Sequence, residues 1–156
     1  IAIITGTAHH YTSKERFAGY KKAMEEHSLP IQPDFVQCGH YSIEGGYDAM
    51  LRLFALPHKP TAVFISNYDM TVGAYLAINY LKLKIPNEIS VIGFDNFPLA
   101  KVVNPPLSFA EQPTDAMGLS AGKLLYKRIK GDYSDYPQTI IHNPAFYYKE
   151  SICRLS

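Results

Sequence analysis

Polar residues that could bind a small molecule lie near the ends of successive apolar runs in this sequence. Arg16 comes shortly after the first run, Asn67 follows the third run, and Asp95 follows the fourth. An arginine presents its N–H donors as a planar fork that suits ligand hydroxyls or a carboxylate. Asp95 would add an acceptor, Asn67 a two-way amide, and Tyr41 an aromatic face. These residue types favour a site for a small polyhydroxylated or anionic molecule.

The same residues also allow a purely structural interpretation, and the sequence alone leaves it open. Arg16 can pair with Glu15 or another surface acid, Asp95 can cap a turn, and Tyr41 can pack at the rim. Single residues of these types are common on protein surfaces, so their order in the chain does not decide between the two interpretations.

Other chemistry finds little support in the sequence. The adjacent pair His9–His10 has no HxxxH or cysteine partner, so we expect a polar loop and no metal site. Residues 120–123 match SxxK but lie within an amphipathic helical pattern without SDN or KTG elements. No GxGxxG, GKS/T or GxSxG motif is present, and paired carboxylates would arise only if Asp69 and Asp95 met in space. We therefore expect no enzyme and no cofactor.

Strands and helices alternate along the chain. Each of the first four predicted strands ends at Gly or polar residues, and the predicted strands are 1–5, 35–38, 61–65, 89–94 and 107–110. Thr12 with Glu15 predicts a capping box for the first helix, whereas Ser42 and Ser66–Asn67 predict simpler caps for the next two. A last helix is predicted to start at 113–114. Within it, Gly118 and Gly122 indicate close packing against another helix.

The end of the chain changes character. Residues 138–142 and 145–149 are predicted as two short strands. The whole pattern predicts an α/β fold, a doubly wound and mostly parallel sheet with helices on both faces. In such folds ligands bind outside the carboxyl ends of the strands, where the polar residues above are expected to meet.

Composition sets the limits of function. The 156 residues are 47% hydrophobic and 19% charged, with a formal net charge of +1. No run approaches the roughly 20 apolar residues of a membrane span, and no basic cluster suits nucleic acid. Cys38 and Cys153 show no metal-binding spacing, which favours reduced thiols in a cytoplasmic protein. Because the chain opens directly in a strand at Ile1 without a methionine or leader, we expect a fragment of a longer protein.

Several segments in order carry a family resemblance. They are 1–6, 15–20, 46–49, 60–64, 67–74, 85–86, 89–96, 105–108 and Gln112. Over essentially its whole length the chain resembles the C-terminal part of the effector-binding region of LacI/GalR-type bacterial transcriptional regulators, which is itself similar to periplasmic sugar-binding proteins. No single segment is specific to this family, but the order and spacing of the segments together are.

The resemblance implies roles for individual residues. Arg16 matches the arginine that contacts the effector, Asp95 the aspartate that accepts from it, and Asn67 the polar residue at the neighbouring strand end. Tyr41 matches an aromatic position that often stacks on the ligand. The family's variable specificity contacts fall on Thr12, His10 and Gln112. Many members have Asn-Asp where this chain has Asn67-Tyr68-Asp69, so whether Asn67, Tyr68 or Asp69 faces the ligand is open.

The resemblance also implies an architecture. Family members have a helix-turn-helix headpiece and two lobes that close on an effector. Residues 1–110 and 138–156 would form the C-terminal lobe, and 111–137 would cross to the first lobe. The expected partners are a sugar-like effector, a second copy of the chain and, through the headpiece only, operator DNA, with no membrane. The homodimer contacts would involve Val72, Tyr75, Leu76, Phe97 and Val103. A solute-binding protein of the same fold is the alternative, and an enzyme on a similar sheet is a weaker one.

Overall fold

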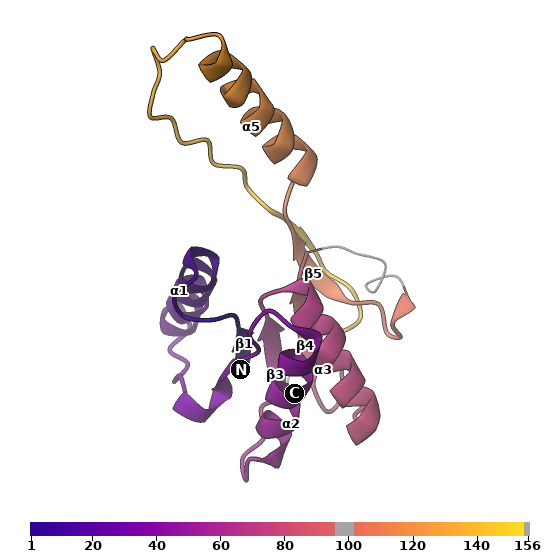
Figure 1. Cartoon of the computed structure of the whole chain (residues 1–156). Helices are drawn as coiled ribbons and strands as arrows, with labels where there is room; N and C mark the ends of the chain where they lie inside the picture. The colour runs from indigo at the N-terminus through magenta and orange to yellow at the C-terminus, as the bar shows by residue number, and fades with distance from the viewer. Residues whose placement is uncertain (96–101, 155–156) are drawn as a thin grey trace.

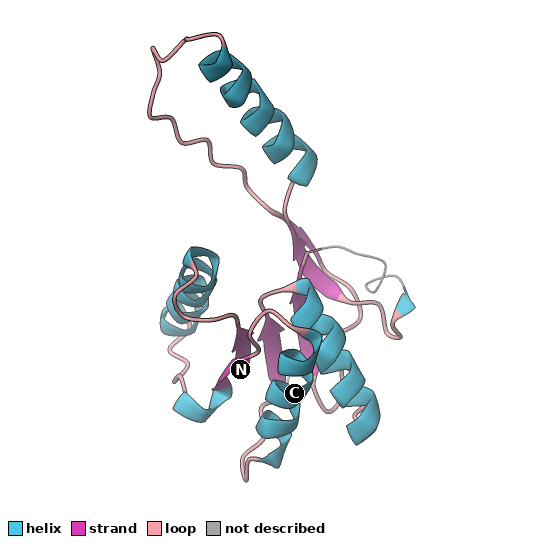
Figure 2. Ribbon diagram, viewed as in Figure 1, coloured by secondary structure: helices cyan, strands magenta, loops and turns pink. Residues whose placement is uncertain are grey.

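The computed structural model describes residues 1–95 and 102–154. Strands and helices alternate in it as the sequence predicts (Figure 2). In chain order the elements are β1 (Ala2–Thr5), α1 (Tyr11–Glu26), the short 3-10 helix η1 (Pro33–Phe35), β2 (Val36–Cys38), α2 (Ile43–Ala55), β3 (Ala62–Ile65), α3 (Tyr68–Leu81), β4 (Ser90–Phe94), β5 (Ser108–Glu111), α5 (Thr114–Ile129) and β6 (Ala145–Tyr147).

The strands form one sheet in the order β2-β1-β3-β4-β5-β6. All neighbours pair in parallel except β5 and β6, which are antiparallel. The parallel pairing brings the carboxyl ends of β1 to β5 to one edge of the sheet, the upper edge in Figure 1. The predicted fold class, a mostly parallel α/β sheet, is confirmed.

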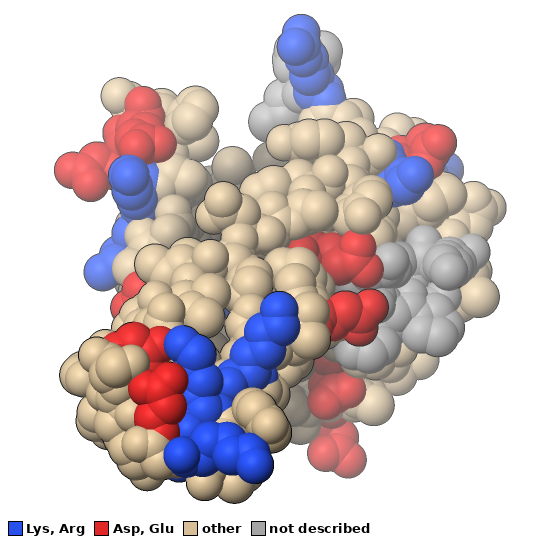
Figure 3. Space-filling view, turned by 90° about the horizontal axis from the view of Figure 1, so that it is seen from above, with Lys and Arg blue, Asp and Glu red and all other residues tan. Residues whose placement is uncertain are grey.

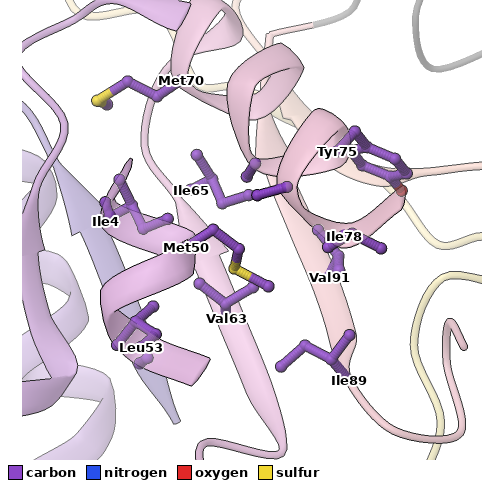
Figure 4. Packing of buried hydrophobic residues seen from close by; sticks show 14 of the residues in the cluster. Ile4, Met50, Leu53, Val63, Ile65, Met70, Tyr75, Ile78, Ile89 and Val91 are labelled. Carbon is purple, nitrogen blue, oxygen red and sulfur yellow. The ribbon is translucent and has the colours of Figure 1, made fainter. Parts of the chain in front are cut away.

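Helices cover both faces of the sheet because neighbouring residues of a strand point to opposite sides. Ile4 faces a core formed with α2 and α3, in which Met50, Ile65 and Ile78 are buried (Figure 4). Ile3, one residue earlier, packs on the other face with Tyr20 and Met24 of α1. The alternation within β1 thus fixes which helix lies on which side, as Figure 1 shows.

Helices α2 and α3 approach each other at two glycines. A Cβ atom at Gly73 would clash with the carbonyl oxygen of Ile43, and one at Gly46 would clash with the carbonyl oxygen of Met70. Both obstacles are backbone atoms, which cannot rotate away. The glycines therefore set the separation of the two helices and, with it, the position of the Asn67 end of α3.

Helix α5 leaves the body of the molecule. It extends away from the sheet in Figure 1 and contains no buried residue. The predicted strand at 138–142 is wrong, because this return segment is not a strand and has no neighbouring strand to pair with among the described residues. The close packing predicted at Gly118 and Gly122 is also not seen, since a Cβ atom at either position would have nothing within 4 Å.

Beyond β6 the chain is tied to the sheet by a buried serine. The hydroxyl of Ser151 donates to the carbonyl oxygen of Val91 at 2.6 Å and accepts from the backbone N–H of Ser108 at 2.7 Å. These two hydrogen bonds join the tail to both β4 and β5. The return of the chain to the sheet after α5 is thereby fixed.

The helix starts show which predicted caps are correct. The side chain of Ser42 accepts from the backbone N–H of Gly45 at 3.0 Å, and that of Asn67 accepts from Met70 at 3.3 Å, so both caps are confirmed. The capping box of Thr12 and Glu15 is wrong. Helix α1 begins earlier, with His10 at the N-cap, and Thr12 lies inside its first turn, where its hydroxyl is directed to Tyr41.

Candidate functional site

Arg16 reaches from α1 to the carboxyl ends of β3 and β4. Its Nη1 donates to the carbonyl oxygen of Ser66 at 2.6 Å, and its Cζ lies 3.8 Å from the ring centroid of Phe94. The side chain can reach these strand ends because helical side chains tilt toward the start of their helix. Arg16 is half-buried at the rim.

Burial and charge act against each other on this guanidinium. Burial lowers the pKa of Arg16, whereas the nearby Asp95 carboxylate and Tyr41 raise it. The net pKa is lower than usual, but an arginine remains protonated in proteins. The site therefore presents a permanent, partly desolvated cation, which binds an acceptor more strongly than a fully hydrated one would.

Asp95 and Gln112 form a second polar group at the rim. The amide Nε2 of Gln112 donates to Oδ1 of Asp95 at 2.8 Å. The backbone N–H of Asp95 donates to the carbonyl oxygen of Ala110 at 2.7 Å, and its φ of +73° turns the chain away from β4. One carboxylate oxygen is thus engaged by the segment that leads to α5.

Tyr41 and Thr12 meet on the other side of the rim. Their hydroxyl oxygens are 3.0 Å apart, and the ring of His10 lies edge-on to that of Tyr41 with centroids 5.4 Å apart. The Tyr41 ring packs against the backbone of Gly6, where a Cβ atom would overlap it. Tyr41 takes a φ of +57°, so an unusual backbone conformation places this ring.

Asn67 and Asp69 lie at the start of α3. The side-chain oxygen of Asn67 accepts the hydrogen bond that caps α3. The amide nitrogen of the same side chain takes no part in that cap. Asp69 is exposed in the first turn. Helix capping thus explains the position of Asn67 without a ligand.

Similarity to known proteins shows which family the chain belongs to. Residues 1–152 match the family described as the periplasmic binding protein-like domain. The chain belongs to that family. It is 39% identical over 157 residues to the probable HTH-type transcriptional repressor ExuR of Bacillus subtilis, covering all of this chain and 46% of the repressor. The chain thus spans about half the length of the curated relatives it matches.

Solved structures agree with this assignment. A LacI family regulatory protein from Chloroflexus aggregans superposes with a TM-score of 0.86 at 28% identity, covering 97% of this chain and 54% of that protein. A complex of the transcriptional regulator CelR with cellobiose gives a TM-score of 0.88 at 26% identity, covering 96% of this chain and 46% of that regulator. The predicted resemblance to the effector-binding region of LacI-type regulators is confirmed.

Within this periplasmic binding protein-like domain, three groups that the sequence did not assign to the site contact a predicted side chain. They are the Phe94 ring, the carbonyl of Ser66 and Gly6. Phe94 looks like an ordinary strand residue, and a backbone carbonyl carries no sequence signal. Only the stop of the first apolar run at Gly6 hinted at a special position.

The predicted dimer residues divide between core and surface. Leu76 is 51% exposed on α3 and Val72 is half-buried, but Tyr75 is only 5% exposed and belongs to the core. Val103 packs in part against the same core. Phe97 lies outside the described residues. Tyr75 thus offers little area to a partner, and Leu76 is the more accessible side chain.

An apolar groove of about 600 Å³ adjoins the rim on one face of the sheet. It runs between α1 and strands β3 to β6, and Arg16, Phe64 and Phe94 are among its lining residues. Among the residues that the structure describes, no three His, Cys, Asp or Glu side chains are grouped to hold a metal ion. In the same residues, no helix has the length and apolar character needed to cross a membrane.

Proposed function

We propose that this chain is the ligand-sensing portion of a LacI-type transcriptional repressor and that its rim binds a small, sugar-like effector. The observation that carries the proposal is the convergence of Arg16, Asp95, Gln112, Tyr41 and Thr12 at one edge of the sheet. Repressor relatives favour a regulator over a solute-binding protein of the same fold or an enzyme. As a regulator of transcription it would act in the cytoplasm.

The chemistry of the rim supports a hydroxyl-rich ligand. The Arg16 fork would donate to ligand oxygens, and the second oxygen of the Asp95 carboxylate would accept from a hydroxyl. The ring of Tyr41 would cover an apolar face of a sugar, as aromatic side chains do in ligand sites. His10 and Thr12, beside Tyr41, would contribute to specificity. Asn67 and Asp69 are weaker candidates for contact.

Calorimetry of the intact protein would test this proposal, with D-ribose, cellobiose and D-galacturonate as ligands. We expect one of the three to bind, and Arg16→Ala to weaken that binding at least about tenfold, since hydrogen bonds from a charged donor contribute about 1.5–3 kcal/mol. Arg52→Ala is the matched control, because Arg52 pairs with Gln37 and the carbonyl of Cys38 outside the proposed site. Binding that survives Arg16→Ala would contradict the site.

We also propose that residues 111–137 cross to a second lobe in the whole protein, with 1–110 and 138–156 forming one lobe. The support is that α5 buries no residue and that Gly118 and Gly122 have open space beside them. Lobe closure on the effector would then alter DNA binding by a headpiece outside this chain. A coupling of about 1–3 kcal/mol between effector and DNA suffices for such a switch.

The surface charge is consistent with DNA binding elsewhere. Viewed from above, several Lys and Arg side chains gather beside a row of Asp and Glu side chains, and the other charged side chains are scattered over uncharged surface (Figure 3). Some of the basic groups are paired, since both Lys127 and Arg128 contact Asp135, at 2.9 and 2.7 Å.

In this proposal the chain senses the effector and pairs with a second copy, mainly through Leu76 and Val72.

A further inference from the structure

Two contacts of different kinds fix the Arg16 guanidinium. The hydrogen bond from Nη1 to the carbonyl oxygen of Ser66 lies at one edge of the group, whereas Phe94 contacts its centre, with Cζ 3.8 Å from the ring centroid. The first contact sets where one nitrogen lies. The second restrains the group over the ring face, where a cation is attracted by the ring quadrupole.

The backbone of Phe94 belongs to the sheet. It is the last residue of β4, and its Cα pairs with that of Ala110 in the parallel register of β4 and β5. The next residue is Asp95, the expected acceptor of the site. One strand end therefore places both the surface under the donor fork and the acceptor beside it, so their spacing is set by the backbone.

A restrained arginine should bind a ligand more tightly than a mobile one. A free arginine side chain has many rotamers and loses conformational entropy when it is ordered. If ordering occurs during folding, the ligand does not have to offset that entropy loss on binding. Both contacts of Arg16 are made by groups of this chain, so they do not depend on a ligand atom.

We propose that Phe94 is a positioning residue for effector binding: its ring holds the Arg16 guanidinium at the rim, so that an effector meets a preformed donor fork. This inference rests on the proposed function only where it concerns effector affinity. The positioning itself is a property of the ligand-free protein and can be measured without any effector.

Nuclear magnetic resonance of the ligand-free protein tests the positioning. The Arg16 Nε–Hε signal, assigned by its loss in Arg16→Lys, should be shifted by the Phe94 ring current. The shift should persist in Phe94→Tyr and disappear in Phe94→Leu, which keeps an apolar side chain without a ring. Phe64→Leu is the matched control, because Phe64 lines the same groove from β3 and has no described contact with Arg16.

Affinity for the same three sugars completes the test. Phe94→Leu should weaken the binding of whichever sugar binds by about tenfold, the scale of a cation–π contact, while Phe94→Tyr and Phe64→Leu change it less than about threefold. The circular dichroism spectrum of each variant would verify its fold.

An Arg16 signal that is the same in wild type and Phe94→Leu would overturn the inference, as would unchanged sugar affinity in that variant. If none of the sugars binds, the proposed ligand class fails, and the NMR comparison alone decides whether Phe94 positions Arg16.

Discussion

At the scale of single residues, the Tyr75 hydroxyl is unusual. Tyr75 is 5% exposed, and its hydroxyl has no hydrogen-bond partner among the described residues. Burial raises the pKa of Tyr75 far above its ordinary value, so the hydroxyl stays neutral. A buried polar group without a partner has a desolvation cost that no hydrogen bond offsets.

Removing that hydroxyl should therefore not destabilise the chain. We expect Tyr75→Phe to leave the free energy of unfolding unchanged or to raise it by up to about 1 kcal/mol, measured by urea denaturation. Tyr20→Phe is the matched control, because the Tyr20 hydroxyl donates to the carbonyl oxygen of Ile1 at 2.8 Å, and its loss should cost about 1 kcal/mol. A clear destabilisation by Tyr75→Phe would reveal a hydrogen-bond partner.

At the scale of elements, the packing of α2 on α3 depends on Gly73. A methyl group there would meet the backbone of Ile43 and Tyr47, so the two helices would have to separate. We expect Gly73→Ala to lower the free energy of unfolding by about 2 kcal/mol or more, because overpacking outweighs the helix propensity gained.

Gly19→Ala provides the opposite case in the same measurement. Gly19 lies inside α1 with nothing within 4 Å of an added Cβ atom. Only helix propensity should change, which stabilises the chain by up to about 1 kcal/mol. Equal effects of the two substitutions on the urea midpoint would contradict the role of Gly73 in helix packing.

At the scale of the whole molecule, α5 presents apolar side chains to solvent. Leu125 is 62% exposed, and Met117, Leu119 and Ile129 are also exposed. Apolar area of this kind favours association in water. We expect Leu125→Asp to reduce concentration-dependent self-association of this chain in sedimentation velocity, without a change in its circular dichroism spectrum, because α5 contributes nothing to the core.

Sedimentation velocity of the intact protein distinguishes the α3 surface from the α5 surface. Val72→Asp on α3 should instead weaken the proposed dimer of the intact protein, in which α5 would be covered by the second lobe. Self-association that is unaffected by Leu125→Asp would show that α5 is not the surface responsible. An intact protein that stays dimeric with Val72→Asp would contradict the proposed interface.

The local parts of the fold were predictable from the sequence. The β-branched runs that became β1, β3 and β4 have the length and composition of buried strands, and Ser42 and Asn67 cap their helices through hydrogen bonds to residues three positions away. Arg16, Asp95 and Tyr41 each come after a predicted strand, and they could be placed at one edge because parallel strands share a direction. These features depend on neighbours in sequence or on one rule of topology.

The tertiary structure decided what depends on distant residues. It brought Arg16 into contact with Phe94 and Gln112 into contact with Asp95, buried Tyr75 in the core, and left 138–142 without a strand partner among the described residues. It also showed that Thr12 is directed to Tyr41 and does not cap its helix. Each of these outcomes is set by a side chain or strand far away in sequence, and the periodicity of one segment contains no information about which distant group it will meet.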